Sequence, residues 1–113
     1  MTIVNRTNAE HYRWGGACDG WRLLARADLS VIKERIPPGL GEVSHFHERA
    51  RQLFYVLSGR LAIELPEGVM ELQPGDSLEV PPRTVHRVHN PFAEEATFLV
   101  ISSPSTASDR TNV

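Results

Sequence analysis

Turn-forming residues interrupt this chain so often that it has no room for long helices. Eight prolines and eight glycines occur among 113 residues, several of them in clusters such as Pro37-Pro38-Gly39, Ser58-Gly59 and Pro81-Pro82. Between the clusters lie runs of about five to eight residues rich in β-branched, aromatic and leucine side chains, which is typical of strands separated by tight turns. The pattern predicts an all-β sandwich or barrel.

Eight segments have the composition and length expected of strands. They are residues 21–26, 30–36, 52–57, 60–65, 69–72, 77–80, 85–89 and 96–102. We therefore expect a barrel over residues 21–103, preceded by an N-terminal arm, residues 1–20. Residues 104–113 are polar, and we expect them to form a flexible C-terminal tail.

The composition is that of one soluble domain, with 41% hydrophobic and 23% charged residues. The formal charge of −2 provides no strong field for nucleic acid or for an anionic membrane, so neither partner is expected. The longest apolar run, residues 53–57, is far too short to span a bilayer, and the amino-terminal residues carry no hydrophobic signal segment. A single cysteine, Cys18, fits a reducing compartment. We expect a cytoplasmic protein.

Both faces of the strand at residues 52–57 are apolar. If Gln52 faces inward, strand alternation directs Leu53, Tyr55 and Leu57 outward. Exposed apolar patches of this kind mark interfaces, so the pattern predicts a homodimer. Coverage of the same face by the N-terminal segment fits the sequence equally well.

Two histidines separated by one residue are the first candidate for chemistry. His45 and His47 project from the same face of an extended segment and can converge on one metal ion. Their surroundings are regularly spaced: Gly39, five residues, His45, one residue, His47, four residues, Gln52, six residues, Gly59. A second stretch runs Gly75, five residues, Pro81, one residue, Arg83, two residues, His86, three residues, Asn90.

These two stretches resemble the paired signature motifs of the cupin superfamily, in particular its small single-domain members. The resemblance implies a double-stranded β-helix, which is a jelly-roll barrel that uses its interior as a ligand pocket. It also implies one divalent transition metal, either Mn, Fe, Co, Ni, Cu or Zn. The implied metal ligands are His45, His47, Gln52 and His86.

The sequence departs from the family motifs at two positions. Gln52 stands where the family usually has Glu, so the ligand set is neutral and the metal keeps its full charge. A stronger Lewis acid favours isomerisation, hydration, dehydration or lyase chemistry over redox chemistry. This ligand set is also similar to that of the pectin-degradation cupins and the cupin-type hydroxynitrile lyases. Arg83 stands where the family has Gly, and it is either a clamp for an anionic substrate or a solvated surface residue.

If Gln52 points inward, strand alternation directs Phe54 and Val56 inward as well, and an inward His86 likewise implies an inward Val88. The predicted substrate pocket is therefore largely apolar. Arg83 would lie at its mouth.

Two residues are candidates for acid or base catalysis, Glu34 and Tyr55. Whether Glu34 faces the interior depends on the register of its strand, which the sequence leaves open. We therefore expect a mononuclear metal-binding protein that acts as a Lewis-acid isomerase or lyase on a small hydroxy or carbonyl compound. The alternatives are a metal-dependent dioxygenase and a non-enzymatic module that binds a small ligand.

Overall fold

The computed structural model describes all 113 residues as an all-β protein without a helix, and so without a helix that could span a membrane. Its strands are β1 (Glu10–Trp14), β2 (Cys18–Ala25), β3 (Ser30–Ile36), β4 (His45–Phe46), β5 (Arg51–Ser58), β6 (Leu61–Leu65), β7 (Gly68–Leu72), β8 (Ser77–Val80), β9 (Arg87–His89), β10 (Ala96–Ser103) and β11 (Thr111–Asn112). All eight predicted segments are strands. The short strands β1, β4 and β11 were not predicted.

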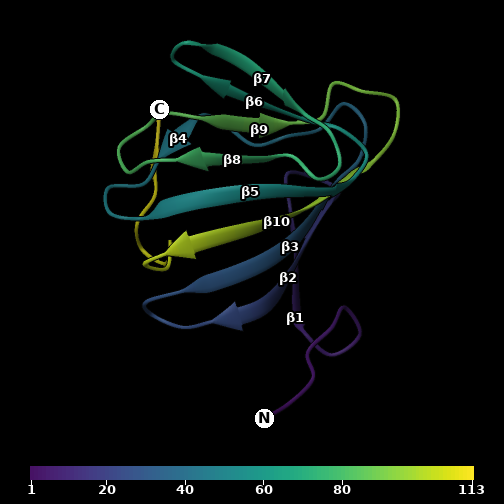
Figure 1. Cartoon of the computed structure of the whole chain (residues 1–113), viewed down its shortest axis with the longest axis vertical. Coiled ribbons are helices and arrows are strands. Elements are labelled where there is room, and N and C mark those ends of the chain that lie inside the picture. Colours follow the sequence, from purple (N-terminus) through teal and green to yellow (C-terminus); the bar gives the residue numbers. More distant parts are fainter.

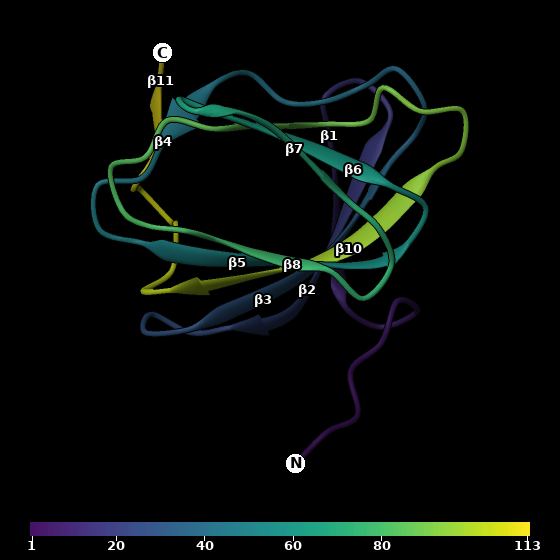
Figure 2. The same cartoon turned by 45° about the horizontal axis from the view of Figure 1, so that its top comes forward.

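The strands form a jelly-roll barrel. One wall is a six-stranded sheet in the order β1-β2-β3-β10-β5-β8, and a three-stranded sheet, β7-β6-β9, lies opposite it (Figure 1, Figure 2). A two-stranded sheet, β11-β4, lies at one end of the barrel beside the C-terminus (Figure 2). The predicted all-β double-stranded β-helix is therefore confirmed.

Strand β5 shows the alternation that the sequence predicts. Gln52, Phe54 and Val56 are buried, whereas Leu53 and Tyr55 on the opposite face are 36% and 38% exposed. Pairing with β10 on one side and β8 on the other fixes this register. Gln52 consequently points into the barrel.

A hydrophobic core lies between the two walls of the barrel. Its largest completely buried side chains are Phe98, Ile36, Leu61 and Ile63, which come from both sheets. Burial of each such side chain contributes roughly 1.5–3 kcal/mol to folding. The core therefore joins the two walls of the barrel.

Gly59 closes the turn between β5 and β6, and no other residue fits there. Its φ of 70° lies in the left-handed region, and a Cβ atom would lie 2.1 Å from the carbonyl oxygen of Glu95. Both the backbone conformation and the close approach exclude a side chain. This explains the glycine at that position of the first motif.

Both ends of the chain take part in the barrel. Strand β1, which lies in the segment expected as an arm, pairs along its whole length with β2. Strand β11, in the segment expected as a flexible tail, pairs with β4, and the backbone N–H of Val113 donates to Ser44. The C-terminal residues thereby lie against the strand that carries the first motif histidine.

Candidate metal centre

Three buried histidines converge inside the barrel. Ligand nitrogens of His45, His47 and His86 all lie within 4.8 Å of one another. His45 and His86 also exchange backbone hydrogen bonds, with N···O distances of 3.1 and 2.9 Å. This pairing of the two motifs places their side chains together, although they are 41 positions apart in sequence.

The orientation of each imidazole is fixed by its own neighbourhood. The Nδ1 atom of His45 lies 2.9 Å from the carbonyl oxygen of Val43, and that of His86 lies 2.9 Å from that of Thr84. The Nδ1 atom of His47 lies 2.5 Å from the carbonyl oxygen of Asp109. A carbonyl can only accept, so each Nδ1 carries the proton and each Nε2 presents its lone pair. Metal-binding histidines are oriented in this way.

Burial keeps the three rings neutral. It lowers the pKa of His45 to about 3, against the opposing hydrogen bond to Val43. Burial also lowers the pKa values of His47 and His86. Neutral imidazole is the form that binds a metal ion, so the site needs no proton to be displaced at physiological pH.

Gln52 supplies a fourth donor beside the histidines. Its amide nitrogen donates to the Ser102 hydroxyl at 3.2 Å, which leaves Oε1 without a partner. The Nε2 atom of His86 is likewise buried and unpartnered. Buried polar atoms are rarely left unsatisfied, so two of them at one site indicate a missing ligand. A metal ion would satisfy both.

A cavity of about 110 Å³ opens next to this cluster. His45, His47 and Gln52 form one side of it, and Ile32 and Glu34 of β3 form another. Strand β3 therefore directs Glu34 inward, which settles the register that the sequence left open. The hydroxyl of Tyr12 donates to the Glu34 carboxyl at 3.3 Å.

Of the two carboxyl groups that line the cavity, that of Glu34 has the pKa furthest from its ordinary value. Burial, together with the negative charge of Glu42, raises the pKa of Glu34 to about 8. Glu34 is consequently protonated at neutral pH. Burial and the Glu34 charge also raise the pKa of Tyr12, so its hydroxyl stays a donor. Tyr12 was not singled out by sequence reasoning, and strand alternation in β1 is the only signal that could have suggested it.

Glu42 closes the inner end of the cavity. Its carboxylate accepts a hydrogen bond from the backbone N–H of Val88 at 3.1 Å and lies 3.8 Å from the guanidinium of Arg110. Burial raises its pKa to about 7 in spite of these partners. Arg110 also lines the cavity, so the C-terminal segment contributes a charge to the site.

Asp109 ties the C-terminal segment to the loop after His47. Its carboxylate accepts three backbone hydrogen bonds, from Glu48, Arg49 and Ala50, at 2.8, 3.1 and 3.0 Å. Although burial opposes the change, these three donors lower the pKa of Asp109. Its backbone carbonyl is the acceptor for His47. Asp109 was missed by sequence reasoning because no local pattern connects it to a residue 62 positions away.

Three of the residues predicted to line the substrate pocket, and the catalytic candidate Tyr55, lie at different distances from the cavity. Phe54 lines the cavity as expected, whereas Val56 and Val88 belong to the hydrophobic core behind it. Tyr55 lies on the outer face of β5 and does not reach the cavity. Phe54 is therefore the only one of these four that the structure brings to the site.

Arg83 lies outside the cavity, and its side chain is 71% exposed beside Glu48. Its φ is 62°, so an arginine adopts the left-handed conformation where the family motif has glycine. The backbone N–H of Arg83 still donates to the His47 carbonyl at 2.7 Å. The substitution therefore leaves the turn before His86 intact.

Comparisons with known proteins agree with this architecture. A family model described as "Cupin domain" matches residues 32–102, which is more than half of the chain. The solved structure of KdgF from Halomonas sp. superimposes with a TM-score of 0.83 and 21% identity, over 93% of this chain and 94% of that one. Pac13, a nucleoside dehydratase from Streptomyces, gives a TM-score of 0.80 and 18% identity, over 99% and 88%. At 21% and 18% identity, these two similarities show that the chain shares the fold of both proteins, and they show the fold alone.

One enzyme is similar to part of this chain in amino-acid sequence. Quercetin 2,3-dioxygenase from Bacillus subtilis is 38% identical over 56 residues, which are 50% of this chain. The match spans only 17% of that enzyme's length.

Proposed function

The chain belongs to the cupin domain family, and on that premise we propose that it is a mononuclear divalent-metal enzyme of the isomerase or lyase class. Its substrate would be a small hydroxy or carbonyl compound. The observation that carries the proposal is a neutral donor set beside a buried carboxyl group. His45, His47, His86 and Gln52 contribute no negative charge, and Glu34 faces the same cavity.

The residues present fit a metal ion. The unpartnered Oε1 of Gln52 and Nε2 of His86 are the orphaned atoms that an ion would satisfy. A bound divalent cation supplies a Lewis acid that polarises a carbonyl or hydroxyl oxygen of the substrate. Because no ligand neutralises its charge, that polarisation is stronger than with the usual Glu ligand.

Glu34 is the proton-transfer group in this proposal. Burial raises the pKa of Glu34 to about 8 in the metal-free protein, which is close to neutral pH, as proton transfer requires. In its protonated form Glu34 can donate a proton to a leaving hydroxyl group. In its deprotonated form it can instead accept a proton from the carbon beside the polarised oxygen and return it to the next carbon. The hydroxyl of Tyr12 positions the Glu34 carboxyl by donating to Oε2.

The rest of the cavity orients the substrate and limits water. Phe54, Ile32 and Val100 line the cavity with apolar surface. At about 110 Å³ the inner cavity accepts a few non-hydrogen atoms, so only the reacting end of a substrate fits beside Glu34.

The test measures metal content first and proton transfer second. Plasma mass spectrometry should find close to one transition metal per chain, and His47→Ala should lose it. The matched control is His11→Ala, because His11 pairs with Asp19 outside the cavity. The loaded protein is then incubated in D2O with a panel of small hydroxy and carbonyl compounds. We expect deuterium incorporation or elimination for at least one compound, and its loss in Glu34→Gln. Metal-independent turnover would contradict the proposal.

The second candidate is a metal-dependent dioxygenase that uses the same ligands. The identity to quercetin 2,3-dioxygenase over half of the chain favours it. An oxygen electrode separates the two candidates, because Lewis-acid isomerisation or elimination consumes no O2. Tight binding of a compound without turnover or oxygen uptake would instead identify a non-enzymatic binding module.

A further inference from the structure

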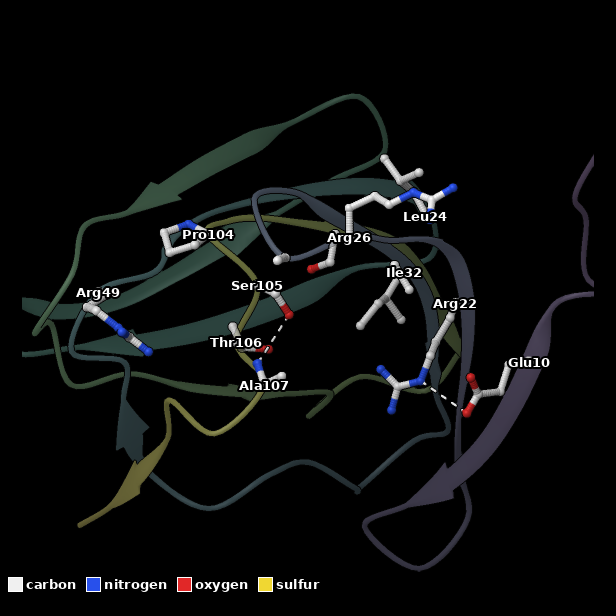
Figure 3. A pocket seen from close by; sticks show the side chains of 13 residues that line it. Glu10, Arg22, Leu24, Arg26, Ile32, Arg49, Pro104, Ser105, Thr106 and Ala107 are labelled. Atoms are coloured by element: carbon white, nitrogen blue, oxygen red, sulfur yellow. Dashed lines mark hydrogen bonds and ion pairs between the residues drawn. The ribbon is translucent and has the colours of Figure 1, made fainter. Parts of the chain in front are cut away.

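A second and larger cavity, of about 870 Å³, lies on the outside of the metal cavity. We call it the vestibule. Its walls come from β1, β2, β3, the β4–β5 loop and the C-terminal segment (Figure 3). The polar and charged residues that line it include Glu10, Arg22, Arg26, Arg49 and Thr106.

The vestibule carries an excess of positive charge. Three arginines and one carboxylate line it, so the balance is two positive charges. Arg26 and Arg49 have no carboxylate within ion-pair distance, and Arg22 has only Glu10, at 3.6 Å. Arg49 and Arg22 lie at opposite sides of the vestibule, and the guanidinium of Arg22 is directed toward Glu10 (Figure 3). Unpaired guanidinium groups around a concavity are the arrangement that recognises carboxylate and phosphate groups.

The vestibule adjoins the cavity beside the histidines. Ile32 and Thr106 line both spaces. The guanidinium of Arg22 also lies 4.5 Å from the ring centre of Tyr12, whose hydroxyl donates to Glu34 in the inner cavity. The arginines of the vestibule and the histidine cluster therefore lie on either side of Ile32 and Thr106.

We propose that the vestibule binds the anionic group, either a carboxylate or a phosphate, of a substrate whose opposite end reaches the metal. The inference rests on the proposed function for the reacting end alone, because anion binding by the arginines does not need a metal. The inner cavity accepts only a few atoms, and the vestibule accommodates the remainder of the molecule. Arg22 and Arg49 bind the anion from two sides, and Glu10 competes with it for Arg22.

The test measures anion binding to metal-free protein by NMR, with the arginine Nε–Hε signals as reporters. The probes are glycerol 3-phosphate, glycerate and glycerol, which share one skeleton and differ in the terminal group. We expect saturable binding of one or both anions and none of glycerol. Arg22→Gln and Arg49→Gln should each weaken that binding at least tenfold, and Glu10→Gln should strengthen it. The relative affinities of the first two probes distinguish a phosphate site from a carboxylate site.

The matched control is Arg60→Gln. Arg60 is exposed and lies over the Phe92 ring, outside both cavities, so its replacement should leave the affinity unchanged. Wild-type affinity in both vestibule variants, equal binding of glycerol, or no saturable binding overturns the inference. Metal titration of the same samples separates the two proposals. Anion binding that depends on the arginines in a chain that binds no metal would overturn the proposed function and leave the vestibule assignment standing.

Discussion

Replacing Asp109 by alanine tests whether the C-terminal segment positions the metal site. The carboxylate of Asp109 accepts the backbone N–H groups of Glu48, Arg49 and Ala50. Glu48 and Arg49 are exposed, so water can replace the lost acceptor at a cost of about 0.5 kcal/mol each. Ala50 is buried, and its unsatisfied N–H should cost about 2 kcal/mol. The free energy of unfolding should therefore fall by about 3 kcal/mol.

The same change should weaken metal binding. The backbone carbonyl of Asp109 orients His47, and loss of the carboxylate frees the segment that carries it. Removal of a group that orients a metal ligand typically costs about 10- to 100-fold in affinity. Calorimetric titration with Zn²⁺ or Ni²⁺ measures this change, and chemical denaturation measures the stability.

Two further variants make the result interpretable. Asp109→Asn keeps one acceptor oxygen and should have a smaller effect on both quantities. Asp76→Ala is the matched control, because Asp76 accepts the N–H of Gln73 in an exposed turn away from the site. Wild-type metal affinity in a folded Asp109→Ala protein would refute the positioning role.

Three other predictions follow from the structure. The pKa of Glu34 is raised from 4.5 to about 8, so the stability that its protonated form contributes is complete below pH 4.5 and is lost as the pH rises through about 8. Glu34→Gln should flatten this pH dependence of the free energy of unfolding, as measured in denaturation curves. An unchanged pH dependence would contradict the burial of the group. Arg83→Gly should raise the free energy of unfolding by about 1 kcal/mol, because glycine adopts a φ of 62° without strain, and a destabilised variant would count against it. We also propose a homodimer through the outer face of β5, where Leu53 and Leu57 are 36% and 40% exposed; light scattering should detect the dimer, and Leu53→Lys with Leu57→Lys should dissociate it, whereas a monomeric wild type would refute it.

Much of the barrel was predictable because strands and turns leave local signals. Alternation in β5 depends only on residues two positions apart, so the inward direction of Gln52 and Phe54 follows from the sequence. The short strands β1, β4 and β11 were not predicted. Two of them contain only two residues, which is too few for a periodic pattern.

The candidate metal ligands were found from the spacing of two histidines together with the resemblance to the cupin motifs. His45 and His47 share a face of one extended segment, and the matching second stretch adds His86. Arg83 shows what spacing leaves open: the sequence allowed either an anion clamp or a solvated surface residue, and the turn directs its side chain into solvent. The direction of a side chain at a turn depends on the backbone conformation, and residue spacing does not encode it.

The sequence alone determined the all-β class, the strand alternation and the histidine pattern, because these depend on residues within a few positions of each other. Only the tertiary structure decided that Glu34 faces the cavity beside the three histidines, because that register is set by pairing of β3 with β2 and β10. Only the tertiary structure placed Tyr12, Asp109 and Arg110 at the site, since pairing of β1 with β2 and of β11 with β4 brings residues from both halves of the chain to it. The physical reason is range: periodicity is a property of neighbouring residues, whereas the partners of a buried polar group are chosen by the whole fold.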